Sequence, residues 1–370
     1  MKTMKKNLCG AAVVAAGICS GPALAQVVLY GVYDTGIEYV TNANAARDSV
    51  IRVPHITGSI PSRLGFRGTE DLGGDLKAIF TLETGFDPGR GAVGQGNRLF
   101  GRQAFVGLKN ANGTLRIGRQ YSMLSTSLSK ADVIGPSIHS AINNDPYINN
   151  ARTDNSIGYL GEFTNFTAGL TYSFGRDTST AGGAGGSNCP GEVPGNRKAC
   201  RQVTAMLGYD AASAGVAVAY DIMYGNTGAT NVSGPINPLN NSSYNDERFV
   251  YNGYVKFGAA KIGLGLIDRK THAAKETGTQ LSFLGVSYPF ANAWVLDSQV
   301  SRLKVKRSND ASTLFVVRGA YSFSKRTAVY TSLGFIRNGG AAAIAVDNGG
   351  AAGGPGMNQT GVMTGIRHSF

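Results

Sequence analysis

Arginines recur at alternating positions in the first half of the chain. In residues 62–68, Arg63 and Arg67 alternate with apolar side chains. Arg116 lies between two apolar residues, and Arg152 shares the parity of the small residues that follow it. Side chains at every second position of a strand point to the same face. The four arginines therefore predict a row of fixed positive charges, whose chemistry is the electrostatic attraction of anions.

Four further charged residues are candidates for the same space. Lys77 and Glu83 alternate with apolar side chains in the segment after the first two arginines. Asp132 and Asp145 lie in residues 122–153, the longest link in the first half of the chain. If this link folds inward, its acids face the basic residues and weaken their field. If it is an ordinary surface loop, they face water.

A two-residue period of apolar side chains recurs along nearly the whole chain. It is clear in residues 62–86, where an acidic, glycine-containing turn at 70–75 separates two alternating segments. Residues 166–174, 216–224 and 249–257 repeat the pattern, with Thr, Ser, Gly, Asp or Lys among the residues of the other face. Such alternation predicts strands with one apolar face. Many of these faces end in Tyr or Phe, which is typical of strands that cross a membrane interface.

Sixteen such segments are predicted. They begin near residues 27, 62, 76, 99, 114, 154, 166, 203, 216, 249, 261, 281, 294, 314, 327 and 360. Long links cover residues 40–61, 86–98, 122–153, 175–202, 225–247 and 338–358, whereas other links have only a few residues. This layout predicts an all-β protein: a sixteen-stranded antiparallel transmembrane β-barrel with short periplasmic turns and long extracellular loops. A barrel of this size is too wide for side chains to fill, so its interior holds water.

The composition agrees with an exported membrane protein. Of the 370 residues 42% are hydrophobic and only 16% are charged, against about 25% charged in typical soluble domains. Residues 1–25 combine three lysines, a short apolar run and Ala23-Leu24-Ala25, which predicts a signal peptide cleaved before Gln26. The apolar run is shorter than the ~20 residues that a spanning helix needs. Cleavage removes basic residues but no acid, and the mature chain, residues 26–370, stays basic.

Two cysteines remain after cleavage. Cys189 and Cys200 flank a stretch rich in Gly and Pro. In an exported chain this spacing predicts a disulfide that closes one loop, with two free thiols as the alternative. Zinc is disfavoured because neither a histidine nor a third cysteine lies nearby, and no metal or other cofactor is predicted.

Other classes of protein explain less of the sequence. A soluble β-sandwich accounts for the alternation, but not for the signal peptide, the aromatic strand ends and the terminal Phe370 together. The histidines lie in or beside predicted loops or near the chain end, where they form no catalytic pair with a serine. The glycine-rich stretches neither follow a buried strand nor open a helix, so they do not predict phosphate binding. Enzymatic activity and nucleic-acid binding are therefore not expected.

Six stretches resemble the general diffusion porins of β-proteobacteria, the neisserial and Bordetella type. They are VVLYGVYDTGIEYV, SRLGFRGTEDLGGDLKAIFTLETGF, LFGRQAFVGLKNANGTLRIGRQY, ARTDNSIGY, YSFSKRTAVYTSLGF and GIRHSF, within residues 26–370. The resemblance implies a homotrimer in the outer membrane, surrounded by lipid and lipopolysaccharide. Each barrel would let small hydrophilic solutes and inorganic ions diffuse passively, through a pore narrowed by the third extracellular loop, about residues 122–153.

The resemblance also implies roles for single residues. Arg63 and Arg152 match constriction arginines, and Phe370 looks like the signal read by the barrel assembly machinery. A related anion-selective member has an arginine where this chain has Gln103, so the field should be weaker at that level. We expect a modest anion preference. The alternatives are a porin specific for an anionic or carboxylated solute, and a barrel that serves only as a platform for adhesion.

Overall fold

The computed structural model describes residues 26–370 except 56, 182–185 and 230–237, so the expected signal peptide lies outside the described residues. In this part of the chain the wall has sixteen long strands: β1 (Gln26–Val40), β3 (Arg63–Gly73), β4 (Leu76–Gly85), β5 (Gln103–Asn110), β6 (Gly113–Tyr121), β8 (Ser156–Phe163), β9 (Phe166–Ser173), β10 (Gln202–Asp210), β11 (Ala214–Tyr224), β12 (Asn245–Phe257), β13 (Ala260–His272), β14 (Thr277–Ala291), β15 (Trp294–Val305), β16 (Ala311–Ser322), β17 (Thr327–Gly339) and β18 (Gln359–Ser369). Two short strands are β2 (Val50–Arg52) and β7 (Arg152–Thr153). All sixteen predicted strands are confirmed, and each begins within four residues of its predicted position.

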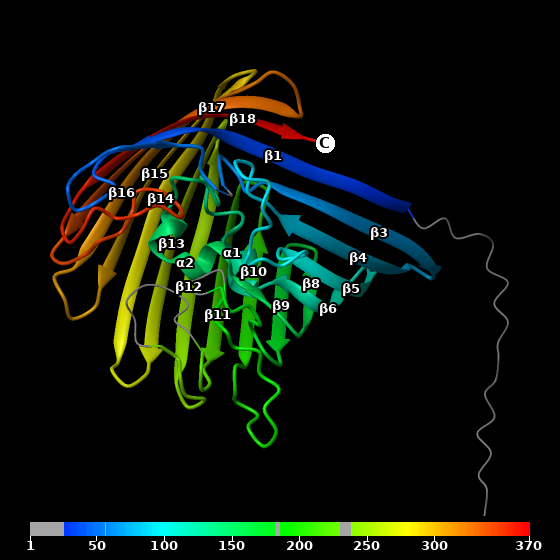
Figure 1. Ribbon diagram of the computed structural model, residues 1–370. Coiled ribbons are helices and arrows are strands. Elements are labelled where there is room, and N and C mark those ends of the chain that lie inside the picture. Colours follow the sequence, from blue (N-terminus) through cyan, green and yellow to red (C-terminus); the bar gives the residue numbers. More distant parts are fainter. Residues whose placement is uncertain (1–25, 56, 182–185, 230–237) are drawn as a thin grey trace, which may run out of the picture.

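The barrel closes at β1, which pairs with two partners along its length. Its first half, Gln26–Val32, pairs antiparallel with β3, and its second half, Val32–Val40, pairs antiparallel with β18. Every other long strand pairs with its neighbours in sequence, so the ring is complete (Figure 1). Closure leaves no free edge, which is the condition for placing strands in a membrane.

The chain end completes the seam between β1 and β18. The backbone N–H of Gly31 donates to the carbonyl of Phe370 at 3.0 Å, and the N–H of Phe370 donates back at 3.1 Å. A side chain at position 31 would begin 2.3 Å from the Phe370 ring, so only glycine lets that ring lie against β1.

The alternation of the sequence becomes an inside and an outside. Along β17 the exposed Leu333 and Phe335 alternate with the buried Ser332 and Ile336. Aromatic pairs lie at both ends of the wall: Trp294 and Tyr321 near short turns, with ring centroids 4.9 Å apart, and Tyr172 and Phe174 near a long loop, at 5.1 Å. Such aromatic girdles mark the two interfaces of a membrane.

The link after β6 runs inside the barrel. It contains α1 (Met123–Leu128), the 3-10 helix η1 (Ala141–Asn144) and α2 (Pro146–Asn149), and Figure 1 shows α1 and α2 within the ring of strands. Ser122 caps α1 by accepting a hydrogen bond from the N–H of Ser125, and the N–H of Met123 donates to Thr204 on β10. Among the described residues, no helix has the length and apolar character needed to cross a membrane.

The fourth long loop carries a disulfide between Cys189 and Cys200. Both cysteines are buried and are also held by backbone hydrogen bonds: the N–H of Cys189 donates to Asp177 and that of Cys200 to Gly225. The disulfide joins two points of one loop and crosses no strand pairing of the wall.

Removal of Phe370 tests the seam. The truncated chain should be secreted normally but should insert poorly into the outer membrane, because the last pairing with β1 is lost. Heat-modifiability of the membrane fraction on gels measures the folded barrel. Normal amounts of heat-modifiable protein from the truncated chain would contradict this expectation.

Replacing both Cys189 and Cys200 by Ser tests the role of the disulfide. A closed loop of this length restrains the unfolded chain by ~3 kcal/mol in the entropy model. Because the barrel is held by many strand pairings, single-channel conductance should stay unchanged and only the fourth loop should become more sensitive to protease. Loss of the folded barrel in the double variant would show instead that the disulfide supports the wall.

Candidate functional site

A cavity of about 730 Å³ lies between the inner wall and the link that runs inside the barrel. Its wall side comes from β1, β3, β4, β5 and β6, and its other side from α1 and the residues around Pro136 and Ile148. The charged side chains that line it are Arg63, Arg67, Glu83, Arg102, Asp132 and Arg152. Four guanidinium groups therefore share one space with two carboxyl groups.

Three of the four arginines that the alternation singled out line this cavity. Arg63 and Arg67 extend from β3, and Arg152 extends from β7. Arg116 does not line it. Both of its sequence neighbours are exposed on the outer face of the wall, so the Arg116 side chain faces inward. It lies only three residues from Gly113, where β6 begins after a short turn. Parity gives the face of a strand but not the height along it, so the four arginines do not form one continuous row.

Lys77 also lies away from this cavity. It is the second residue of β4, beside the turn that joins β3 and β4, and it pairs with Asp71 and Lys109. Glu83, six residues further along the same strand, does line the cavity. The side chains of Lys77 and Glu83 both point inward, and the two residues differ only in their position along the strand.

Glu83 holds a cluster of partners on the wall. It accepts a hydrogen bond from Arg102 Nε at 2.7 Å and from the Tyr30 hydroxyl at 2.9 Å, and Arg63 Nε lies 3.8 Å away. Two guanidinium groups thus share one carboxylate. The cluster keeps a net positive charge while it fixes the positions of the arginines.

Arg102 is the lining residue that the sequence analysis missed. It precedes β5 at a bend, so strand parity does not apply to it, and it is almost fully buried. The one available signal was its position next to Gln103, where the resemblance pointed to an arginine in a related protein. Arg102 thus supplies a guanidinium to the cavity one residue before Gln103.

Tyr121, the last residue of β6, holds two of the arginines together. Arg152 Cζ lies 4.6 Å from the centroid of its ring and Arg102 Cζ lies 5.9 Å from it. Both guanidinium groups also donate to its hydroxyl, at 3.2 Å and 2.5 Å. A cation over an aromatic face is stabilised by the ring electrons, so Tyr121 keeps two like charges close without a carboxylate between them.

Asp145 faces a basic wall residue, but not one of those predicted. It caps α2 and accepts a hydrogen bond from Arg248 Nε of β12 at 2.9 Å. Arg248 is fully buried, also pairs with Asp246, and lies over the ring of Tyr147, 4.5 Å from its centroid. Asp145 is therefore an anchor that fastens the inner link to the wall, and it does not line the open cavity.

Asp132 lies at the cavity and is half-buried. Its carboxyl accepts hydrogen bonds from Gln299 Nε2 at 2.8 Å and from the backbone N–H of Gly135 at 3.0 Å. Burial raises its pKa above the ordinary value, although these hydrogen bonds act in the opposite direction. Within the described residues no group of three or more potential metal ligands is found.

The matching family model and three similar proteins are all described as porins. The family model described as Gram-negative porin matches residues 10–341. Outer membrane porin protein 32 of Delftia acidovorans is 32% identical, over 99% of this chain and 100% of that protein. An outer membrane porin protein of Bordetella pertussis is 39% identical over 48% of this chain and 50% of its own length. The solved anion-selective porin from Comamonas acidovorans superposes with a TM-score of 0.75 at 27% identity, covering 94% of this chain and 100% of that one.

Asp145→Asn tests the anchor of the inner link. The substitution weakens a charge-assisted hydrogen bond to the buried Arg248, so we expect a loss of about 1–3 kcal/mol locally and a link that detaches more often. Planar-bilayer recordings should show noisier open-channel current and a higher mean conductance.

Asp132→Asn is the matched control. Its carboxylate accepts hydrogen bonds from a side-chain amide and from a backbone N–H, and the side-chain oxygen of an asparagine can accept the same two bonds. The control should therefore keep current noise close to that of the unsubstituted protein. Equal noise in the two variants would contradict the assignment of Asp145 as the anchor.

Proposed function

Since this chain belongs to the Gram-negative porin family, we propose that its outer-membrane channel admits small hydrophilic solutes and ions with a modest preference for anions. The porin channel and the outer-membrane location follow from the family and the barrel. The sign of the selectivity, the roles of single residues and the assembly are the proposal.

One observation carries the preference for anions: Arg63, Arg67, Arg102 and Arg152 line the same cavity. Of the two acids there, Glu83 is shared between two of these arginines, and the half-buried Asp132 accepts hydrogen bonds from neutral groups. Low-dielectric walls strengthen the field of fixed charges across a narrow channel. An anion in the cavity would thus meet more positive than negative charge.

The constriction itself belongs to the proposal. Residues 122–153 would narrow the channel, with α1 and α2 held against the far wall by Met123 and Asp145. The solved structure named anion-selective lends support, because it covers nearly the whole chain. In this chain Arg102 would partly compensate for Gln103.

We further propose that the chain is cleaved after residue 25, acts as a homotrimer, and has no catalytic role. Large apolar side chains are strongly exposed on the first strands and their links, which offers a surface for a second copy: Ile37, Ile51, Leu99 and Val106 are each more than half exposed. Outer-membrane lipid, lipopolysaccharide and the barrel assembly machinery are the other partners we propose.

Reversal potentials in a tenfold KCl gradient test the selectivity. We expect a modest chloride preference that shrinks as salt rises, because the Debye length falls from about 10 Å at 0.1 M to about 3 Å at 1 M. Arg63→Glu and Arg67→Glu should each shift the reversal potential toward the value expected of a cation-selective channel. Arg152→Gln, which removes one charge without reversing it, should produce a smaller shift.

Lys77→Glu and Arg116→Glu are the matched controls, because both positions share the inward parity but lie outside the cavity. They should shift the reversal potential less than the changes at positions 63 and 67. A cation-selective unsubstituted channel, or equal shifts at all four positions, would refute the assignment of selectivity to the cavity. Saturable current with one anion would indicate a substrate-specific porin, and absence of conductance would indicate a platform for adhesion.

A further inference from the structure

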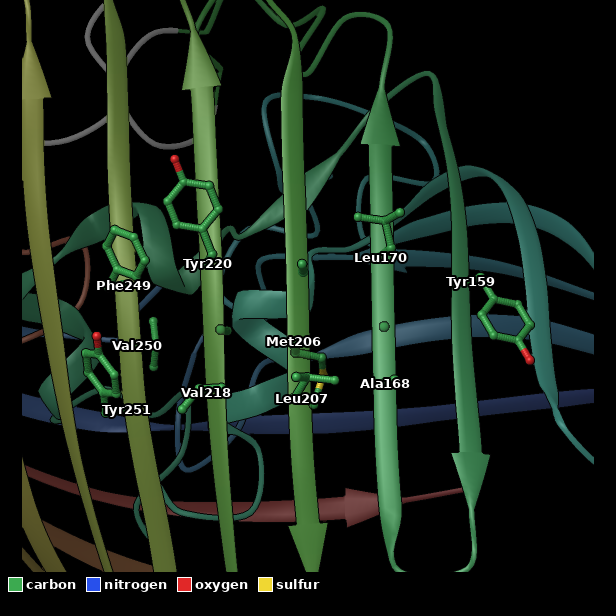
Figure 2. A pocket seen from close by; sticks show the side chains of 13 residues that line it. Tyr159, Ala168, Leu170, Met206, Leu207, Val218, Tyr220, Phe249, Val250 and Tyr251 are labelled. Carbon is green, nitrogen blue, oxygen red and sulfur yellow. The ribbon is translucent and has the colours of Figure 1, made fainter.

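An apolar groove of about 540 Å³ crosses the outer face of the wall between β8 and β12, outside the channel. Figure 2 shows it from outside, with Tyr159 and Leu170 on one side and Tyr251 on the other. The groove exists because Ala168 and Ala205 occupy outward positions among large neighbours. Ala168 pairs with Leu207 and Ala205 with Tyr220, so small side chains form its floor and large ones its rims.

Two cations stand at the long-loop end of this groove. Arg201 Cζ lies 5.1 Å from the ring centroid of Tyr172 and 5.2 Å from that of Phe174, and Arg201 donates to the Tyr172 hydroxyl at 2.6 Å. Lys198 Nζ lies 6.0 Å from the ring centroid of Tyr224. Tyr172 and Tyr224 belong to the outward rows of β9 and β11, and the exposed Phe174 directly follows β9, so the cations face the membrane side of the wall.

Neither cation lies within ion-pair distance of a carboxylate in the described part of the chain; the side-chain partners of Arg201 are a hydroxyl, a carbonyl oxygen and two rings. Glu247 of β12 also points outward, but it lies two strands from Arg201 and 3.7 Å from His272. Positive charge at the interface end of the groove is therefore open to an anion from outside.

The spacing of the cations and the groove fits an amphiphile. Arg201 directly precedes β10 and lies four residues before Ala205, which corresponds to about 14 Å at the ordinary rise of a strand. A molecule that fills both places has an anionic group at the interface and an apolar chain directed toward the middle of the membrane. Phosphate suits the planar guanidinium, which can donate two hydrogen bonds to its oxygens.

We propose that this surface, made of the groove around Ala168 and Ala205 and the cations Lys198 and Arg201, binds a phosphate-bearing lipid of the outer leaflet. The phosphate contacts the two cations, and one acyl chain lies in the groove. A second copy of the chain is a poorer occupant, because unpaired cations would be buried with it. The groove also lies on other strands than the apolar surface that we assign to the trimer.

The disulfide between Cys189 and Cys200 lies next to both cations of this surface. Lys198 lies within the loop that Cys189 and Cys200 close, and Arg201 follows Cys200 directly. The carbonyl of Cys200 accepts a hydrogen bond from the N–H of Arg176 at 3.0 Å, which fixes the same point from the neighbouring loop segment. The disulfide thus holds the cations above the groove, although the barrel does not need it.

Native mass spectrometry of the purified, delipidated porin tests the proposal. The probes are dimyristoyl phosphatidic acid and dimyristoylglycerol, which differ only in the phosphate. Phosphatidic acid should bind at a defined stoichiometry, and dimyristoylglycerol should bind at least about tenfold more weakly, the effect of losing one hydrogen bond to a charged group. Arg201→Gln and Ala205→Trp should each lower the affinity for phosphatidic acid by a similar factor, and so should the double Cys→Ser variant.

Arg302→Gln and Ser282→Trp are the matched controls. Arg302 is an exposed, outward cation near the end of β15 that precedes the short link 306–310, on the same side of the barrel as the long loops, and Ser282 is a small, exposed, outward residue of β14. Both controls should bind phosphatidic acid like the unsubstituted protein. All variants should keep normal conductance, since the surface lies outside the channel; if Ala205→Trp does not, Ala205→Leu replaces it.

Three results would overturn the proposal. Equal losses in the controls would show diffuse attraction of anionic lipid to the whole barrel. Equal binding of dimyristoylglycerol would show that the phosphate plays no part. Displacement of the lipid by inorganic phosphate alone would show an anion site in the loop that needs no acyl chain.

Discussion

The structure depends first on the need to satisfy every backbone polar group inside a membrane. Hydrocarbon offers no hydrogen bonds, so a sheet must close on itself. Closure is achieved at β1, whose first half pairs with β3 and whose second half pairs with β18, and the backbone of Phe370 adds the last two bonds. Outward apolar side chains then face lipid, while inward positions hold the polar residues of the aqueous interior and apolar residues such as Ile336 that pack against the inner link.

A wide interior by itself discriminates little between small solutes, and we propose that the inner link makes it selective. Its charged anchor, Asp145 with Arg248, is buried against the wall opposite the basic cavity. On the cavity side, Tyr121 and Glu83 hold Arg63, Arg102 and Arg152 near one another. The carboxylates Glu83 and Asp145 are thus used to position other groups, and of the cavity arginines Arg67 is exposed and Arg63 partly exposed. On the outer face of the barrel, too, aromatic rings and not acids hold the cations Arg201 and Lys198.

Strand parity explains why the fold was predictable and the site only partly so. A two-residue period is a local property, so β17 and β18 could be located from their own residues. The lining roles of Arg63, Arg67 and Arg152 agree with their parity, but height along the barrel depends on register and tilt. Arg116 and Lys77 have the inward parity and lie near short turns. Arg102 lies outside any strand ladder, at a bend that no periodicity describes.

The sequence by itself determined the barrel, its strand positions, its family resemblance and the loop closed by Cys189 and Cys200, because these rest on short-range pattern and on motifs. Only the tertiary structure decided which charges meet. Asp145 and Arg248 are separated by 103 residues, and Arg201 stands over a groove lined by five strands. Such contacts arise when distant segments are brought to one height of a closed ring, and no local pattern in the chain encodes that height.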